Sequence, residues 1–261
     1  MLQIVTAQPA LQTFIKSFWF LDIATGSDVP LALSPVPEQC LYFYPKSLPT
    51  PFDANGKPIT AYNNIIAGQA VTGGSKLLVP NQYCMFKILF QPSGFYRLFG
   101  TPMTLFADTT VETVSVLGNP VNNLREQIAN AKGFVDMVTA AETFLLNQIS
   151  TSKIDLLPID KVLQQSDFYR FSLDQLASDA CLSARQFERK FLERTGVSPK
   201  IYQRVVRFNQ ALKIKNAQPH RPWIDITYAC GYFDQMHLLR DFRQFTGQTP
   251  TFFDFDNAII Y

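Results

Sequence analysis

The sequence contains very little histidine and no closely spaced cysteines. Its only histidines are His220 and His237, too few for a metal site built from several histidines, and no His-x-His pattern occurs. The four cysteines, at positions 40, 84, 181 and 230, lack the spacing of a zinc knot or a redox dithiol. We therefore expect no metal site and no cofactor, and we expect the cysteines to be small, buried apolar residues.

Long apolar runs are also absent. None approaches the roughly 18 to 20 residues that a membrane-spanning helix needs. The start of the chain lacks the basic segment followed by an apolar one that marks secretion. We expect a cytoplasmic protein that makes no membrane contact.

The chain does contain ample material for folded cores. It is 47% hydrophobic and 17% charged, which is typical of a globular protein and not of a disordered one. Its 261 residues allow two domains or one large domain.

Positive charge is concentrated in one stretch, although the net charge of the whole chain is only +2. Residues 183–215 hold nine lysines and arginines against Glu188 and Glu193. Such a local excess attracts polyanions such as nucleic acid. Charge alone leaves open the alternative of a solvated helical face. The nine residues are Arg185, Arg189, Lys190, Arg194, Lys200, Arg204, Arg207, Lys213 and Lys215.

The first 115 or so residues have the pattern of β-strands. Short runs of β-branched and aromatic residues are separated by Pro, Gly and Asn, which predicts an antiparallel barrel or sandwich. These runs occupy residues 39–45, 63–71, 75–80 and 83–92.

Helices are expected to follow the strands. From Val121 to Ile149 apolar residues recur every three or four positions, which predicts a short helix and a longer one, broken near Lys132. A polar stretch at 150–153 then predicts a domain boundary. We expect domains at residues 1–153 and 154–261.

Two stretches in the second half nearly repeat each other. Phe187–Pro199 and Leu238–Pro250 share the frame [FL]-x-R-x-F-x-x-x-T-G-x-[ST]-P at an offset of 51 residues. The Thr-Gly pair in this frame ends a helix with a left-handed glycine. Ahead of the first copy, capping-box sequences at 172–175 and 183–186 start two successive helices, which must cross because so few residues separate them. The repeat therefore predicts two helix-turn-helix units.

These units and the helix between them predict an all-α second domain. We expect the first unit at about 172–196, a connecting helix at about 199–216 and the second unit at about 222–247. The connecting helix would be roughly 25 Å long, which is of the right order to place two second helices about one DNA turn, roughly 34 Å, apart. The expected fold class is thus α+β, with a β-rich domain and trailing helices before the all-α domain.

The outer face of each second helix carries the candidate DNA contacts. Phe187 and Phe191 mark the buried side of the first such helix, so its polar residues lie opposite. We expect arginines to read guanine, Glu188 to accept from cytosine and Gln235 to pair with adenine. The candidates are Ser183, Arg185, Gln186, Glu188, Arg189, Gln235, Met236, His237, Leu239 and Arg240.

Some of these candidates have a competing explanation. Arg189 and Arg240 occupy equivalent positions in the repeat, where an arginine can serve a salt bridge within its own unit. Met236 and Leu239 are poor hydrogen-bonding partners, and their contacts would be thymine methyls or phosphates. The first unit is strongly charged and the second is not, so we expect the first to supply more of the salt-sensitive binding.

Residues 170–253 resemble the DNA-binding domain of the AraC/XylS family of bacterial transcription regulators. The resemblance is most specific in Gly231-Tyr-x-Asp-Gln-x-His-x-x-x-x-Phe242 and the following Gly247-x-Thr-Pro250. It implies two helix-turn-helix motifs joined by a long helix. The chain departs from the family at Thr227, where alanine is common, and at Phe253-Asp254 in place of Tyr-Arg, so a phosphate contact usual there is expected to be missing.

The front of the chain is similar to the cupin-like N-terminal domains of one AraC subgroup. The similarity lies in Phe18-Trp19, Gly68-Gln69 and residues 92–102. It implies a barrel that senses a small molecule, supports dimerisation, or both. The candidate effector pocket consists of Trp19, Tyr42, Tyr44, Phe86 and Phe90, for which the alternative is ordinary barrel core.

The sequence as a whole therefore indicates a transcription regulator that binds double-stranded DNA sequence-specifically and is not an enzyme. The expected partners are DNA, a small-molecule effector, a second copy of the chain and, for an activator, RNA polymerase. The alternatives are a DNA-repair or small-molecule enzyme that carries this DNA-binding module, and a protein-protein adaptor. The scattered cysteines argue against a repair methyl acceptor, which needs a clustered zinc-cysteine site.

Overall fold

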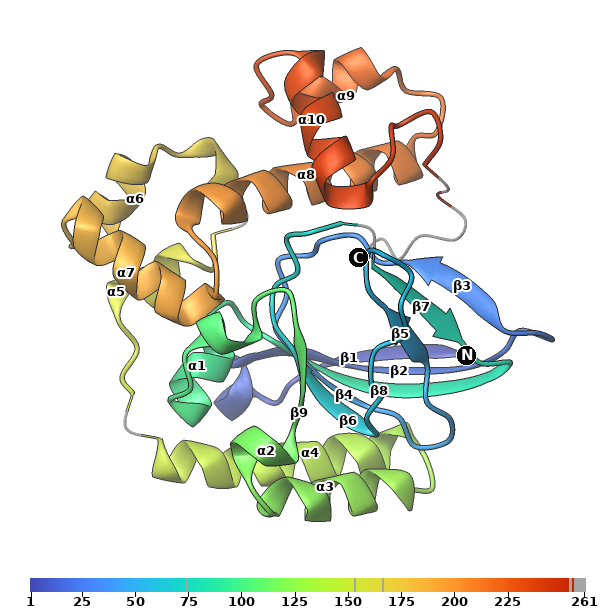
Figure 1. Cartoon of the computed structure of the whole chain (residues 1–261). Helices are drawn as coiled ribbons and strands as arrows, with labels where there is room; N and C mark the ends of the chain where they lie inside the picture. Colours follow the sequence, from blue (N-terminus) through green and yellow to red (C-terminus); the bar gives the residue numbers. More distant parts are fainter. Residues whose placement is uncertain (74, 153, 166, 254, 256–261) are drawn as a thin grey trace.

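The computed structural model describes residues 1–255, apart from residues 74, 153, 166 and 254. The chain forms a β-rich N-terminal part with helices on one side and a helical C-terminal part that lies across it (Figure 1). The predicted α+β class is confirmed. In the described part of the chain, no helix has the length and apolar character needed to cross a bilayer.

Two antiparallel sheets build the N-terminal part. The larger has six strands in the order β1-β2-β8-β4-β6-β9, and the smaller has three in the order β3-β7-β5. The strands are β1 (Leu2–Thr6), β2 (Ile15–Ala24), β3 (Val29–Ala32), β4 (Cys40–Phe43), β5 (Thr50–Phe52), β6 (Asn64–Ala67), β7 (Lys76–Val79), β8 (Gln82–Phe90) and β9 (Thr110–Glu112).

The predicted closed barrel is not formed. The larger sheet has β1 and β9 at its two edges, and in the described residues these two strands do not pair with each other. Closure would need such pairing, but β9 is only three residues long and is followed directly by α2 (Val114–Leu117). Two open sheets match the sandwich alternative better than the barrel.

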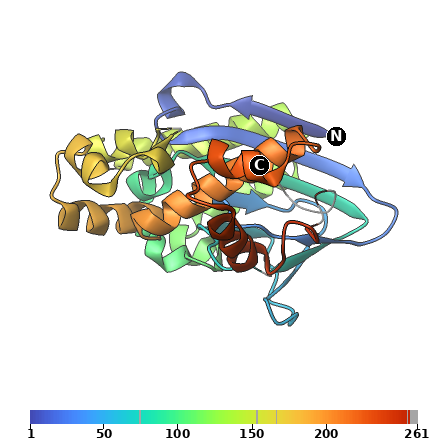
Figure 2. The same cartoon turned by 90° about the horizontal axis from the view of Figure 1, so that it is seen from above.

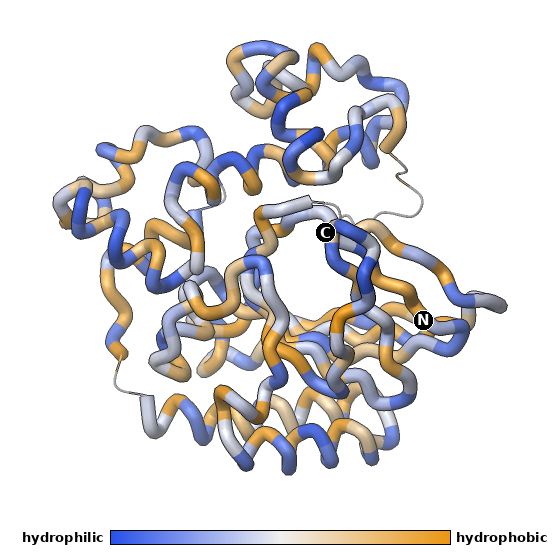
Figure 3. Tube along the Cα trace, in the orientation of Figure 1, coloured by the Kyte–Doolittle hydropathy of each residue, from blue (hydrophilic) through white to orange (hydrophobic). Residues whose placement is uncertain are grey.

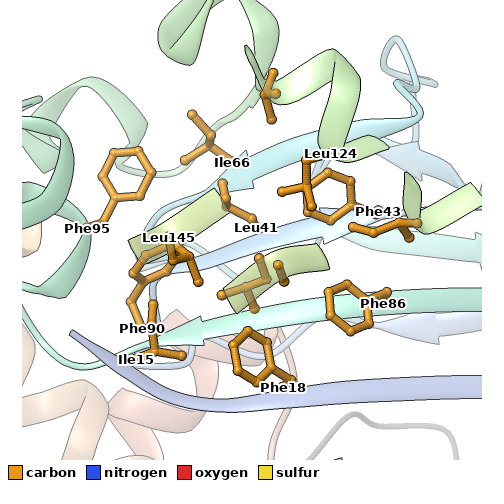
Figure 4. Packing of buried hydrophobic residues seen from close by; sticks show 14 of the residues in the cluster. Ile15, Phe18, Leu41, Phe43, Ile66, Phe86, Phe90, Phe95, Leu124 and Leu145 are labelled. Carbon is orange, nitrogen blue, oxygen red and sulfur yellow. The ribbon is translucent and has the colours of Figure 1, made fainter. Parts of the chain in front are cut away.

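Helices cover one face of the larger sheet and complete the main core. Alternate residues of β8 point to opposite faces, so Phe86, Ile88 and Phe90 face this core while Tyr83 and Met85 face the smaller sheet. The covering helices are α3 (Pro120–Ala129) and α4 (Phe134–Thr151), which insert Leu124 and Leu145 among the phenylalanines (Figure 4). The predicted short and long helices with a break between them are confirmed.

The amphipathic pattern that predicted these two helices is visible along their traces. Hydrophobic and hydrophilic residues alternate on α3 and α4 at the intervals expected for helices with one buried face (Figure 3). Helix α4 ends at Thr151, close to the predicted boundary. Lys153 lies outside the described residues, and the domain limits stay a prediction.

The C-terminal part consists of two small helical cores that share one long helix. Helix α8 (Pro199–Ala217) gives Tyr202 to the first core and Phe208 to the second, and it runs above the β-rich part (Figures 1 and 2). The other elements here are α5 (Pro158–Val162), the 3-10 turn at Phe168–Arg170, α6 (Leu173–Asp179), α7 (Ala184–Thr195), α9 (Trp223–Ala229) and α10 (Gln235–Thr246).

Candidate DNA-binding surface

Two helix-turn-helix units have the same local architecture. In the first unit α6 and α7 cross, and in the second α9 and α10 do. The second helices end at Gly196 (φ 85°) and Gly247 (φ 71°), both left-handed, as the Thr-Gly repeat predicts. The predicted extents of both units and of the connecting helix agree with these elements to within a residue or two.

The start of each second helix is capped by its own side chains. Ser183 Oγ accepts from the N–H of Gln186 at 3.4 Å, and Gln186 Oε1 accepts from the N–H of Ser183 at 3.2 Å, so this capping box is complete. Asp234 Oδ1 accepts from the N–H of His237 at 2.9 Å. Ser183 and Gln186 are therefore engaged in helix initiation, whatever else they contact.

The capping box predicted at the start of α6 is only half formed. Ser172 Oγ accepts from the N–H of Gln175 at 3.2 Å, as expected. The Gln175 amide does not reach back to the cap and donates instead to Asp179 Oδ1 at 2.8 Å. Asp179, one helical turn further along the chain, thus competes with the N-cap for the Gln175 side chain. The capping-box pattern covers only residues 172–175 and does not include Asp179.

The turn between the two helices is one residue longer in the second unit. The N–H of Leu182 donates to Ala177 O at 2.9 Å, and Tyr232 makes the same bond to Thr227 O at 3.0 Å, fifty positions later. The N-caps that follow, Ser183 and Asp234, are fifty-one positions apart. Phe233 is the additional residue, with no counterpart in the first unit.

Cys181 and Gly231 are equivalent residues of the two turns, and both have a left-handed backbone. Their φ angles are 55° and 73°.

Cys181 is exposed, which corrects the expectation that all four cysteines are buried; Cys40, Cys84 and Cys230 are buried. Burial raises the pKa of the Cys40 thiol to about 12 and that of Cys230 to about 11, so both stay protonated at neutral pH.

Replacing Cys181 with glycine should stabilise the protein by about 0.5–1 kcal/mol. A side chain strains the left-handed backbone, and this relief outweighs the entropy that glycine adds to the unfolded chain. The reverse change, Gly231→Ala, should destabilise by about 1 kcal/mol, because an added Cβ there meets no atom within 4 Å and only the backbone is strained. Urea denaturation would measure both, and a loss of stability in Cys181→Gly would contradict the equivalence of the two turns.

Most of the predicted DNA contacts are exposed on α7 and α10 or at their N-terminal ends. Arg185, Glu188 and Arg189 are exposed opposite the buried Phe187 and Phe191. On α10, Leu238 and Phe242 are buried. The exposed candidates also include Ser183, Gln186, Gln235, Met236, His237 and Arg240, whereas Leu239 is half-buried.

The salt-bridge explanation for the repeated arginines receives no support. Within the described part of the chain, neither Arg189 nor Arg240 forms an ion pair, and both are exposed. His237, in contrast, has an acidic partner, because its Nδ1 lies 2.8 Å from Asp234 Oδ1. The hydrogen bonds from His237 hold the pKa of the Asp234 carboxyl below its usual value, which keeps this cap charged.

The positive field of residues 183–215 is smaller than the sequence indicated. Arg194 is buried, and its Nε lies 2.7 Å from Asp160 Oδ1. Arg204 Nη2 lies 2.6 Å from Asp241 Oδ1. The Arg207 guanidinium is half-buried, 4.4 Å from the centroid of the Tyr232 ring. Lys215 Nζ donates to the carbonyl oxygens of Pro219 and Arg221 at 2.6 and 2.9 Å, so at least four of the nine basic side chains have structural partners.

The predicted effector-pocket residues do not come together. Phe86 and Phe90 are buried in the core against α3 and α4. Trp19, Tyr42 and Tyr44 belong to the opposite face of the same sheet, because their positions alternate with core residues. The five residues therefore line no common pocket, and Phe86 and Phe90 follow the core alternative.

A buried ion pair accompanies the aromatic residues on that opposite face. Lys87 Nζ lies 2.6 Å from Glu38 Oε2, with only 1% of the lysine side chain exposed. The same nitrogen lies 5.1 Å from the ring centroid of Trp19 and 5.6 Å from that of Tyr42. A single lysine inside the apolar run of β8 was the only sequence signal for this arrangement.

The N-terminal part touches the C-terminal ends of both second helices. Gln39 Nε2 donates to the carbonyl of Arg194 at 2.7 Å, and the Arg194 guanidinium lies 4.9 Å from the ring centroid of Tyr96. In the second unit, the N–H of Gly73 donates to Gln244 O at 3.2 Å. The middle of α8 is held as well, because Asn209 Nδ2 donates to Pro35 O at 2.7 Å. The sequence contains no short-range signal for these contacts.

Comparisons with known proteins agree with this reading of the C-terminal part. Residues 176–254 match the model of a helix-turn-helix domain, and residues 3–112 match a domain of unknown function. The chain is similar to a probable transcriptional regulator, LumQ of Photobacterium leiognathi, with 25% identity over 111 residues. That match covers 42% of this chain and 44% of the relative, so it spans less than half of either protein.

Among solved structures, the chain is similar at low identity to ToxT from Vibrio cholerae. For strain O395 the identity is 11% and the TM-score 0.45, over 92% of this chain and 96% of the other. For ToxT of strain SCE256 with bound unsaturated fatty acid the values are 11% and 0.46, over 89% and 92%. The two capped units on one connecting helix, together with the matched helix-turn-helix domain and the similar regulator, support the resemblance of the C-terminal part to the AraC/XylS family.

Proposed function

We propose that the protein is a transcription regulator that binds double-stranded DNA in a sequence-specific manner. The observation that carries this proposal is the presence of two capped second helices with exposed outer faces, joined by one helix of 19 residues. A helix of this length spans about 28 Å, which is close to the roughly 34 Å between successive turns of the major groove. The repair-enzyme and adaptor alternatives gain no specific observation from the described residues.

Selection of bound fragments from genomic DNA, followed by titration at several salt concentrations, tests the proposal. A specific regulator enriches a common sequence, and the logarithm of its affinity falls linearly with the logarithm of the salt concentration. The absence of any enriched sequence, or a flat salt response, would contradict it.

Replacing Arg185 with alanine should weaken binding to the selected site by roughly 1–3 kcal/mol and relax the preference at one or two base pairs. The reason is that Arg185 is exposed in the first turn of α7, where a bidentate contact to guanine O6 and N7 is within reach. Arg125→Ala on α3 is the matched control, because it removes an equal charge from a side chain that is 38% exposed outside the two units.

The same titrations separate base reading from other roles. Gln235→Ala should relax the preference for adenine in the second half-site. A loss of affinity that is uniform over all sequences would reassign either residue to a phosphate contact or to a structural role.

We further propose that the N-terminal part responds to a small-molecule effector, supports a homodimer, or both, and that an activating form would contact RNA polymerase. Support for a response to an effector comes from residues 35–39, which contact the sheet residue Lys87, helix α8 and the end of helix α7. Glu38 pairs with Lys87 between the sheets, Pro35 accepts from α8 and Gln39 donates to the end of α7. A molecule that displaced Glu38 from Lys87 would move the segment that holds both helices.

Thermal shift with a panel of metabolites, together with light scattering, addresses these roles. An effector that binds the folded protein raises its unfolding temperature. If the effector also changes the affinity for DNA, bound DNA must change the affinity for the effector by the same factor. A domain that only dimerises shows no thermal shift with any metabolite. Fluorescence microscopy of a tagged chain tests the expected cytoplasmic location.

A further inference from the structure

The additional residue of the second turn presents an aromatic ring to solvent. Phe233 is 84% exposed, and it directly precedes Asp234, the N-cap of α10. Water exposure of a phenylalanine is unfavourable, and the core of this unit is already formed by Leu238, Phe242 and Phe245 on the other side of the helix. The ring therefore has no role in the core.

Two further exposed or half-buried apolar residues lie on α10 itself, three residues apart. Met236 is 54% exposed, and Leu239 is half-buried one turn later. Residues three apart on a helix lie on the same side, so Met236 and Leu239 share a face of α10, and Phe233 precedes the N-cap with its ring against His237. The equivalent positions in the first unit are Arg185 and Glu188, so the second unit has apolar side chains where the first has charged ones. Phe233, Met236 and Leu239 are called the apolar stripe below.

Local contacts orient the ring at the start of the stripe. The rings of Phe233 and His237 meet edge to face, with their centroids 5.9 Å apart and an angle of 80° between the planes. His237 is held in turn by Asp234, whose Oδ1 lies 2.8 Å from Nδ1 and 2.9 Å from the backbone N of His237. Arg240, exposed next to Leu239, places a positive charge beside the stripe.

The major groove offers one apolar group to such a surface. Among the base edges, only thymine carries a methyl group there, at C5, and apolar side chains contact it. Hydrogen-bonding edges of guanine, cytosine and adenine would lose water against the stripe without gaining a partner. A basic residue beside the stripe fits the adjacent phosphates.

We propose that the second unit recognises thymine methyl groups through Phe233, Met236 and Leu239, so that its half-site is defined by thymines at fixed positions. The inference rests on the proposed DNA-binding function and makes it more specific. The first unit reads its half-site by hydrogen bonds and charge, and the second adds apolar contacts to the hydrogen bonds expected from Gln235. Met236 and Leu239 occupy the positions of α10 that correspond to the exposed Arg185 and Glu188 of α7, which is why DNA is chosen over a protein partner as the occupant of the stripe.

The experiment replaces thymines of the selected site by 2′-deoxyuridine, which removes the methyl group and leaves base pairing intact. Binding of the full chain should weaken about three- to fivefold for each contacted thymine of the second half-site, as expected for one lost apolar carbon. The same replacement in the first half-site should change the affinity by less than about twofold. Equal affinity for both bases in both half-sites overturns the inference.

Variants then assign the effect to the stripe. Phe233→Ala and Met236→Ala should bind the thymine site more weakly and lose the distinction between thymine and deoxyuridine. Tyr228→Ala is the control, because it removes an aromatic side chain that is 63% exposed on α9 and should keep the distinction. The replaced side chains are exposed, so unchanged melting temperatures are expected and would be checked first.

Failure of this inference can be told apart from failure of the proposed function. If selection yields no specific DNA, the proposed function is wrong. If selection succeeds but the variants still distinguish the two bases, only the stripe assignment is wrong. Unchanged DNA binding with reduced transcription in Phe233→Ala would reassign the stripe to a protein partner and also overturn the inference.

Discussion

Replacing Arg194 with methionine should destabilise the protein by about 3–5 kcal/mol, the typical cost of leaving one partner of a buried ion pair alone. Only 2% of the Arg194 side chain and none of that of Asp160 is exposed, and the two are 2.7 Å apart. In the variant the Asp160 carboxylate would stay buried without its counter-ion. Its other oxygen still accepts from the N–H of Leu157 at 2.8 Å, but one hydrogen bond does not compensate a buried charge.

A double replacement provides the control for this prediction. Arg194→Met combined with Asp160→Leu removes both charges and should recover a large part of the lost stability, because apolar pairs often replace buried ion pairs without cost. Urea denaturation followed by circular dichroism would give the free energies of unfolding. A loss below about 1 kcal/mol in the single variant would mean that water reaches this pair.

Replacing Gly196 with alanine should destabilise the protein by about 2–5 kcal/mol, much more than the same replacement at Gly247. Both glycines end a second helix with positive φ, so both changes strain the backbone by about 1–2 kcal/mol. At Gly196 an added Cβ would also lie 2.6 Å from the carbonyl oxygen of Met103, whereas at Gly247 it meets no atom within 4 Å. Overpacking of this kind costs roughly 1–3 kcal/mol more.

The difference between the two variants therefore measures the contact of α7 with the N-terminal part. Met103 begins the 3-10 turn Met103–Phe106 and is itself buried, so the turn has little room to withdraw. Paired urea denaturation of Gly196→Ala and Gly247→Ala tests this. Equal losses would indicate that the two parts separate readily, in which case the Arg194 carbonyl would also lose its hydrogen bond from Gln39.

Short-range interactions explain why the sequence predicted the two units so closely. The caps at Ser183 and Asp234 join groups three residues apart, and the terminal glycines respond to their own φ angles. The 3.6-residue period likewise marked Phe187 and Phe191 as buried. Each of these interactions joins residues within one or two helical turns, so the local sequence is enough to predict it.

Apart from the Gln175 side chain, which turns to the nearby Asp179, the main errors in the prediction involve partners distant in the chain. Arg194 was counted with the DNA-binding charges, but Asp160, 34 residues away, and Tyr96 enclose it. Phe86 and Phe90 were grouped with Trp19, because the face to which a residue points is known only when the register of its strand is known. The barrel was expected because strand runs do not show whether the edge strands meet.

Local sequence thus specified the helices, their caps and the exposed faces that are expected to meet DNA. Three-dimensional packing selected which basic side chains remain outside, which aromatic residues enter the core and how the N-terminal part contacts α7, α8 and α10. The physical reason is that a cap or a helical period depends on neighbours within a few residues. Burial of a charge and closure of a sheet depend on groups that only the folded chain brings together.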